Sequence, residues 1–129
     1  MQSAREIVRL LRNDSRLAGR PLLFGGDLNS RHVSNAMDVL LNGTGLRDTW
    51  LVAPKSKTVY ANTSAAAAAY NFSRAIDHIL ATPHWDVLKA GASVRAWDVK
   101  GKPEGPSDHW PVFAEVSLRQ DAGSESDQL

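Results

Sequence analysis

The sequence predicts an α/β (α+β) domain built on a mixed β-sheet that carries helices on one face. Three observations support this fold class. Apolar residues near the start recur at helical spacing, a second short helix follows the first strand, and most later segments are short apolar runs bounded by Gly, Pro or Ser. Such runs are typical of buried strands. At 129 residues, the chain is long enough for one domain with a modest core.

The first helix is predicted where apolar residues fall at i, i+3, i+4 and i+7, namely Ala4, Ile7, Val8 and Leu11. The opposite face carries a stripe of arginines: Arg5, Arg9, Arg12 and Arg16. A solvated helix face is the ordinary interpretation of such a stripe, and contact with a phosphate backbone is the alternative.

The first strand is predicted to begin at Pro21. A second helix is predicted over residues 34–41, with Ser34 as its N-cap and Asn42-Gly43 as its stop. Most of the remaining chain is predicted as strands and loops. Residues 46–52 are interpreted as a turn followed by irregular chain. Strands are expected at 58–62, 75–81, 85–97 (one or two) and 110–118, and loops at 64–69, which is alanine-rich, and 100–106. The predicted domain spans residues 1–119, and residues 120–129, rich in polar side chains, are predicted to be a disordered tail.

Composition excludes few functions. The net charge of +1 argues neither for nor against a polyanionic partner, and the absence of cysteine excludes disulfides and thiolate metal sites. No apolar stretch approaches the roughly 20 residues of a membrane span. The start does not resemble a signal peptide, because Glu6 and several arginines interrupt it. The cellular compartment is left undecided.

Polar residues stand at the ends of three apolar runs: Asp27 after the first, Asp77 near the start of the second, and the pair Asp108-His109 before the third. A carboxylate costs several kcal/mol to bury unless it is paired, hydrogen-bonded or bound to metal. We therefore expect these residues to form one polar site at one edge of the sheet. Carboxylates, an amide and an imidazole suit a divalent cation with an activated water.

At these residues the chain resembles the endonuclease/exonuclease/phosphatase family, the DNase I-like metal-dependent phosphoesterases. The family motif G-D-[FL]-N matches residues 26–29, and R-x-D-[YH]-[IF] matches residues 74–79 with one extra residue after the Arg. The motif S-D-H-x-P-[VLI] matches residues 107–112. All three occur in family order, and the resemblance covers roughly residues 4 to 119.

The resemblance is to the C-terminal half of the family domain, because the N-terminal motifs, including a metal-binding Glu, have no counterpart here. It implies half of a four-layer α/β sandwich, whose sheet has one face made for an absent partner. Candidates for that exposed face are Phe24, Ile79, Trp110 and Phe113.

The resemblance also implies roles for the site residues. His109 would take a proton from water, and Asp77 would hydrogen-bond its ring and stabilise the imidazolium. Asp27 would orient the water or bind metal, Asn29 would donate its amide to a phosphate oxygen, and Asp108 would be a metal ligand for Mg²⁺ (or Mn²⁺). The structural alternative for His109 is a histidine that caps a strand.

No chemistry is assigned to Asp48, and His78 is interpreted as a packing or rim residue. The implied function is metal-dependent hydrolysis of a phosphodiester or phosphomonoester, nucleic acid included among the substrates. The alternative is a catalytically inactive fragment or pseudo-enzyme half-domain that needs a partner chain or associates with itself. A nucleic-acid-binding module that uses the arginine stripe is a third interpretation, disfavoured by the nearly neutral charge.

Overall fold

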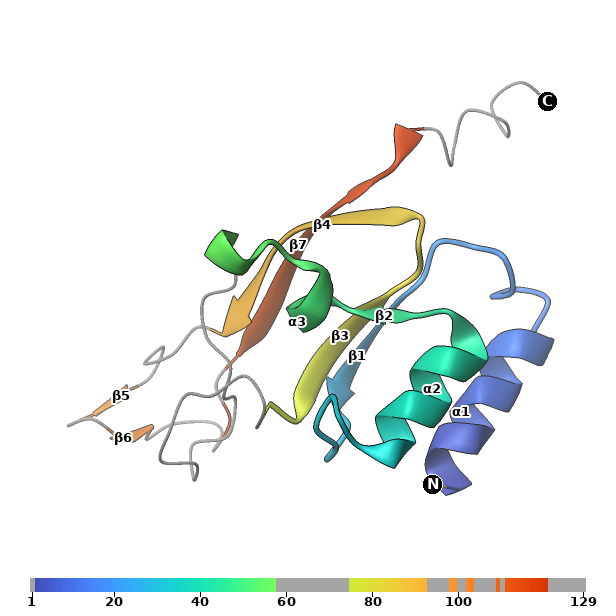
Figure 1. The fold of residues 1–129 in the computed structure, drawn as a ribbon, viewed down its shortest axis with the longest axis horizontal. Coiled ribbons are helices and arrows are strands. Elements are labelled where there is room, and N and C mark those ends of the chain that lie inside the picture. Colours follow the sequence, from blue (N-terminus) through green and yellow to red (C-terminus); the bar gives the residue numbers. More distant parts are fainter. Residues whose placement is uncertain are drawn as a thin grey trace.

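The computed structural model describes residues 2–57, 75–92, 98–99, 102–103, 109 and 111–120. Its helices are α1 (Gln2–Asn13), α2 (Asn35–Thr44) and α3 (Thr49–Val52), followed by the short 3-10 helix η1 (Lys55–Lys57). Its strands are β1 (Leu23–Asp27), β2 (Arg47–Asp48), β3 (Asp77–Ala81), β4 (Trp85–Ala92), β5 (Asp98–Val99), β6 (Lys102–Pro103) and β7 (Val112–Leu118). Figure 1 shows these elements along the chain.

The strands form a three-stranded sheet in the order β1-β3-β2, together with the pairs β4-β7 and β5-β6. Every pair among the described residues is antiparallel. β3 is central in its sheet and also contacts β7, so the two main sheets adjoin (Figure 1). The β1-β3 register places Asp27 opposite Asp77. The α/β fold class predicted from the sequence is confirmed, but the described sheets are antiparallel and not mixed.

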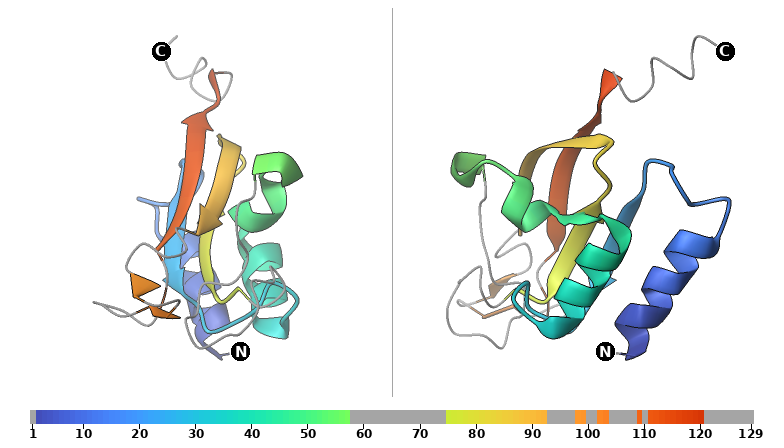
Figure 2. Two further views of the ribbon diagram at one scale, coloured as in Figure 1. Left: turned by 90° about the vertical axis from the view of Figure 1, so that its left-hand side faces the viewer. Right: turned by 45° about the vertical axis from the view of Figure 1, so that its right-hand side comes forward.

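The helices are arranged around one side of this sheet. α2 and α3 lie on the same face, and α1 packs alongside α2 (Figure 2). The main core lies between them and β3, and its buried members are Ala4, Met37, Leu40, Leu46 and Leu80. Among the described residues, no helix is both long and apolar enough to cross a bilayer.

The predicted start of α2 is confirmed, but its predicted stop is wrong. The hydroxyl of Ser34 caps the helix by accepting a hydrogen bond of 3.2 Å from the amide of Met37. The helix continues through Gly43 and ends at Gly45, whose φ of 74° is the left-handed conformation typical of a C-cap. Gly43 serves helix packing instead, because a Cβ there would lie 2.7 Å from Cγ1 of Val8 on α1.

Most predicted strands are confirmed, namely the first, the one that begins near residue 75 and the last. The segment 85–92 is one continuous strand. Two predictions of irregular chain were wrong, since residues 46–52 contain β2 and α3, and the predicted loop 100–106 contains β6. The predicted strand 58–62, the alanine-rich segment 64–69 and residues 121–129 of the predicted tail lie outside the described residues, so the domain boundary stays a prediction.

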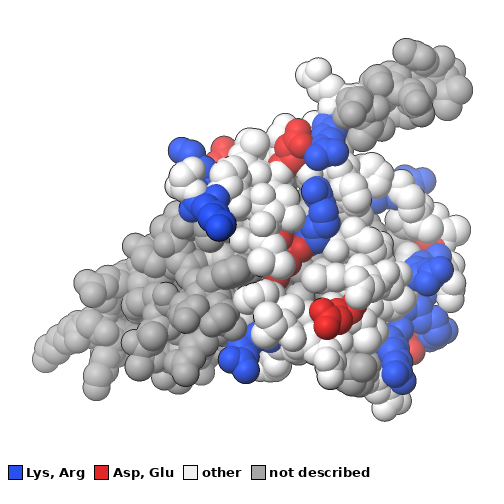
Figure 3. Space-filling model, viewed as in Figure 1, with Lys and Arg blue, Asp and Glu red and all other residues white. Residues whose placement is uncertain are grey.

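The arginine stripe has the properties of a solvated surface. Arg5, Arg9 and Arg12 are exposed on α1, and Figure 3 shows basic side chains along its outer side. Arg9 forms an ion pair with Glu6, and Arg16, which lies beyond the helix, pairs with Asp14 at 2.8 Å. Part of the positive charge is therefore neutralised locally.

The prediction for the exposed sheet face needs one correction. Phe24 does not belong to it, because it points toward the helices and packs against the main core. Successive residues of a strand point to opposite faces, so Leu23 and Ile79 lie on the other side, where Leu23 is 48% exposed. Phe113 is half-buried with the ammonium of Lys89 5.6 Å from its ring centroid. Trp110 lies outside the described residues.

Candidate active site

The site begins with a hydrogen-bonded pair at the start of β3. The carboxylate of Asp77 is nearly buried, and its Oδ2 accepts a hydrogen bond of 2.7 Å from Nδ1 of His109, which precedes β7. Because Nδ1 is the donor to a carboxylate, the ring has a defined orientation, and Nε2 becomes the nitrogen that faces the rest of the site.

Asp27 lies on the other side of the imidazole. It ends β1 directly opposite Asp77, and its Oδ2 is 3.8 Å from Nε2 of His109. Two carboxylates that face each other across a strand pair repel one another. A cation beside them offsets this repulsion. The arrangement therefore favours a positive group at the centre of the site.

The turn after β1 positions Asn29. Gly26 has a φ of 151°, and Asn29 has a φ of 47°, a left-handed conformation that asparagine tolerates better than most residues. The amide of Leu28 donates to the carbonyl of Ile76 at 2.9 Å, and the amide of Asn29 donates to Oδ1 of Asp27 at 2.9 Å. These bonds fold the backbone tightly around the Asp27 carboxylate, with Asn29 exposed beside it.

The donor set suits a hydrated hard cation. Asp27, Asp77 and His109 each offer one ligand atom, and these atoms all lie within 4.8 Å of one another. Asp77 is engaged with the His109 ring, whereas the side chain of Asp27 is 40% exposed. Magnesium in proteins often keeps several waters and is held by only one or two carboxylates. Asp27 fits this role, and Asp108 lies outside the described residues.

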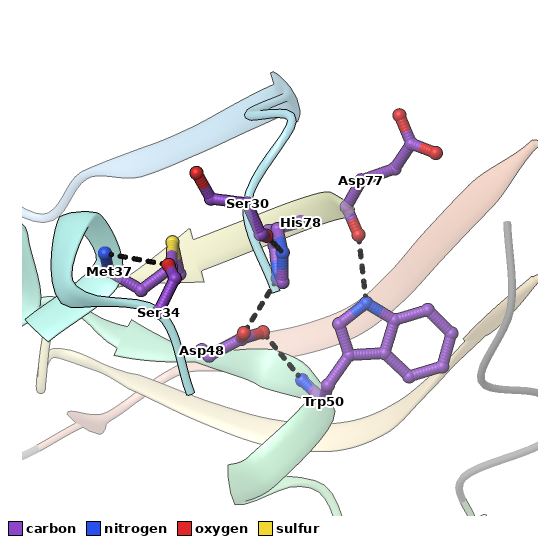
Figure 4. Close-up of polar contacts among 7 residues, drawn as sticks. All are labelled: Ser30, Ser34, Met37, Asp48, Trp50, Asp77 and His78. Carbon is purple, nitrogen blue, oxygen red and sulfur yellow. Dashed lines mark hydrogen bonds and ion pairs between the residues drawn. The ribbon is translucent and has the colours of Figure 1, made fainter. Parts of the chain in front are cut away.

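A second histidine, His78, is buried on the other face of β3. From the sequence, His78 is interpreted as a packing or rim residue and no chemistry is assigned to Asp48. His78 is 0% exposed, in keeping with packing, and its Nδ1 lies 2.7 Å from Oδ2 of Asp48. Its Nε2 donates to the backbone carbonyl of Ser30 at 2.6 Å (Figure 4). The burial of His78 could have been inferred from its place next to Asp77 in a strand. Successive strand residues point to opposite faces, so with Asp77 in the site, His78 must point to the helix-covered face.

Burial alone would lower the pKa of His78. The hydrogen bond and the charge of Asp48 act in the opposite direction, as do the carbonyl of Ser30 and the charge of Asp77. Together they outweigh burial and raise the pKa above its usual value, so the protonated ring is favoured.

The segment that carries Asp48 makes a second contact with the site, through Trp50. Trp50, which is buried, donates its indole N–H to the backbone carbonyl of Asp77 at 2.9 Å. Its own amide donates to Oδ1 of Asp48 at 3.1 Å, which caps α3. Residues 48–50 thus hold both Asp77 and His78 (Figure 4).

The chain is similar in sequence and in structure to known proteins. The profile of the endonuclease/exonuclease/phosphatase family matches residues 1–109. Among solved structures, the Bacteroides thetaiotaomicron mannosyl-6-phosphatase is similar with 23% identity and a TM-score of 0.67, over 91% of this chain and 45% of that one. An endonuclease/exonuclease/phosphatase from Bacteroides vulgatus is 23% identical with a TM-score of 0.68, over 92% of this chain and 43% of that one.

A third structure, an endonuclease/exonuclease/phosphatase family protein from Leptotrichia buccalis, is 20% identical with a TM-score of 0.65, over 89% and 41% of the two chains. No curated protein sequence matches this chain. The chain therefore spans less than half the length of the structures that it resembles.

Proposed function

The chain belongs to the endonuclease/exonuclease/phosphatase family, and we propose that its site takes part in the hydrolysis of a phosphate ester by a water molecule that His109 activates. The observation that carries this proposal is the placement of one imidazole between two carboxylates, 2.7 Å from Asp77 and 3.8 Å from Asp27. A histidine held in this way by one carboxylate is a general base of a familiar type.

The proposed reaction is an in-line displacement at phosphorus. Nε2 of His109 accepts a proton from the attacking water, whose oxygen forms the new P–O bond while the bond to the leaving oxygen breaks. The carboxylate of Asp77 stabilises the resulting imidazolium, and Asp27 orients the water on the other side of the ring. The leaving oxygen, on the opposite side of phosphorus, takes its proton from solvent, and the imidazolium returns its proton to solvent after the displacement.

Asn29 is proposed to bind a phosphate oxygen through its side-chain amide. An amide is an uncharged hydrogen-bond donor, so it stabilises the charge that develops on the phosphoryl group. It also adds no negative charge that would repel the nearby carboxylates or the anionic substrate. Mg²⁺ or Mn²⁺, held by Asp27 and Asp108, would supply charge neutralisation of the phosphoryl oxygens when bound. The proposal covers phosphomonoesters and phosphodiesters, nucleic acid included, because both need the same attacking water.

A second candidate is favoured by the length of the chain. Because it spans 41–45% of the similar structures, further phosphate contacts and a further metal ligand, such as the family's N-terminal Glu, are proposed to come from another segment or a partner chain. That partner would cover the sheet face that carries Leu23 and Ile79. Alone, the chain would then be inactive or weakly active.

The test is hydrolysis by the purified chain with magnesium, using p-nitrophenyl phosphate, bis-p-nitrophenyl phosphate and plasmid DNA as substrates. Losing one preorganised donor typically costs about 100- to 1000-fold in rate, and several are proposed to be absent together, so we expect little or no turnover. The same assay is then run with the N-terminal half of a similar family member added in trans. Turnover that appears on addition and vanishes in His109→Ala supports the proposal.

Two other outcomes decide against parts of the proposal. Turnover by the chain alone that His109→Ala abolishes would mean that this half is catalytically sufficient. Turnover that survives His109→Ala would come from a contaminant, and a complemented protein with no metal-dependent turnover would contradict the hydrolase proposal itself.

A further inference from the structure

The backbone between Asp27 and Ser30 adopts a conformation that needs support. Asn29 has a φ of 47°, a left-handed conformation that costs free energy for most non-glycine residues and less for asparagine. The bond from its amide to Oδ1 of Asp27, at 2.9 Å, is local and exposed to water. A contact on the buried side of the turn therefore adds to its stability.

His78 provides that support. Its ring is 0% exposed, and its Nε2 lies 2.6 Å from the carbonyl oxygen of Ser30, a residue 48 positions away in the sequence. A carbonyl oxygen can only accept, so Nε2 must carry the hydrogen. The contact therefore attaches the turn to the central strand β3 (Figure 4).

Asp48 holds the ring from its other side. Oδ2 of this buried carboxylate is 2.7 Å from Nδ1 of His78, while its Oδ1 accepts the amide of Trp50 at 3.1 Å. With both carboxylate oxygens engaged, Asp48 has a defined position at the start of α3. The ring of His78 is thus held between a helix cap and the Ser30 carbonyl.

We propose that His78, held by Asp48, is a positioning residue that fixes the Asn29-Ser30 turn and thereby sets the places of Asn29 and Asp27 in the site. It touches neither substrate nor reacting atoms. Its value for catalysis rests on the proposed function, in which the side-chain amide of Asn29 donates a hydrogen bond to a phosphate oxygen and Asp27 orients the water. Misplacement of such groups by about 1 Å can cost roughly 100-fold in rate.

Two histidine substitutions separate positioning from general stability. In His78→Gln the amide nitrogen occupies the place of Nε2 and can still donate to Ser30. In His78→Asn the amide reaches only the place of Nδ1, toward Asp48, and the bond to Ser30 is lost. Both substitutions are made in an Asp48→Asn background, which avoids a buried unpaired carboxylate while its amide oxygen still caps α3.

The first readout is amide hydrogen exchange in the chain itself, which needs no turnover. The amides of Leu28 and Asn29 report the turn, and amides of β3 report overall stability. We expect the Asn variant to speed exchange at Asn29 about tenfold more than at β3, the equivalent of one lost buried hydrogen bond. In the Gln variant, the exchange rates at Asn29 and at β3 should change by the same factor. Asp48→Asn alone should leave the turn protected, because a neutral His78 still donates from Nε2.

The second readout is paramagnetic broadening by Mn²⁺ of the Asp27 and Asn29 signals. The Gln variant should keep this broadening and the Asn variant should lose it. The matched control is His84→Asn. The Nδ1 of His84 lies 2.9 Å from the hydroxyl of Thr82, which follows the far end of β3, and this variant should change neither readout.

The inference is overturned if the Gln and Asn variants are alike at Asn29, or if exchange there only follows that of β3. If either double variant fails to fold, Asp48→Asn is compared with Asp48→Ala, which cannot hold the ring, by the same two readouts. Failure of the proposed function gives a different result, because the unaltered chain would then show no Mn²⁺ broadening at Asp27 and Asn29. The amide exchange rates would still decide whether His78 positions the turn.

Discussion

Trp50 and Asp77 are joined by a hydrogen bond of 2.9 Å from the indole N–H to the backbone carbonyl of the carboxylate residue. Both residues are buried, at 4% and 7% exposure. The contact fixes the backbone at the start of β3, where the Asp77 side chain turns toward His109. The position of the proposed base therefore depends on a tryptophan that lies outside the site.

Replacing Trp50 by phenylalanine should destabilise the chain. The substitution keeps an aromatic ring but leaves a buried carbonyl without its donor, which costs about 1–3 kcal/mol. Urea denaturation measures the loss. Trp85→Phe is the matched control, because within the described part of the chain its indole nitrogen is buried with no hydrogen-bond partner. Equal losses in the two variants would show that the bond to Asp77 contributes nothing.

Gly43→Ala should also destabilise, although alanine is the better helix former by about 1 kcal/mol. The new methyl group would lie 2.7 Å and 2.8 Å from the two γ-carbons of Val8, and overpacking of this kind typically costs about 1–3 kcal/mol. The double variant Val8→Ala/Gly43→Ala relieves the clash. Its melting temperature should therefore exceed the value expected from adding the two single effects, and simple additivity would refute the contact.

The charge of His78 should make stability depend on pH. Its folded pKa is raised above the ordinary value of 6.5, so its contribution is fully present below about 6.5 and is lost as the pH rises through the folded value. Urea midpoints measured from about pH 6 upward should fall, and this fall should be smaller in Asp48→Asn, which removes the charge that raises the pKa. Parallel pH profiles for the two proteins would contradict the assignment.

Millimolar magnesium or manganese should raise the melting temperature slightly, and a chelator should reverse the effect. A metal ion at a hundred times the dissociation constant of the site would add about 2.7 kcal/mol, but a site whose further ligand is proposed to come from another segment should stay far from saturation. Asp27→Asn should remove the response. Asp38→Asn, on the exposed surface of α2, is the control that should keep it. A melting temperature insensitive to metal and chelator alike would count against a cation site in this chain.

The sequence was sufficient where local pattern and burial agree. β1, β3 and β7 are short apolar runs with clear stops, and the polar residues at their ends had to meet because each carboxylate needs compensation. The amphipathic α1 and the Ser34 cap followed from spacing and side-chain chemistry alone. These features depend on residues within one turn or one strand.

What the sequence left open depends on tertiary contacts. Gly43 is indistinguishable from a helix stop until Val8 is known to pack on it, and α3 is too short to produce a periodic pattern. The pairing of Asp48 with His78 joins residues 30 positions apart, so no local rule could have found it. Phe24 was placed on the wrong face because an apolar run with few polar residues does not reveal which side faces the helices.

The strand order has a consequence for synthesis of the protein. β1 forms its ladder with β3 and with no other described strand. Its backbone N–H and C=O groups therefore stay unpaired with another strand until β3 has left the ribosome. During that interval α1 and α2 can already pack together, because both are complete by Thr44. A nascent chain stalled between α2 and β3 should therefore present helical structure with an unpaired β1, a form open to capture by chaperones.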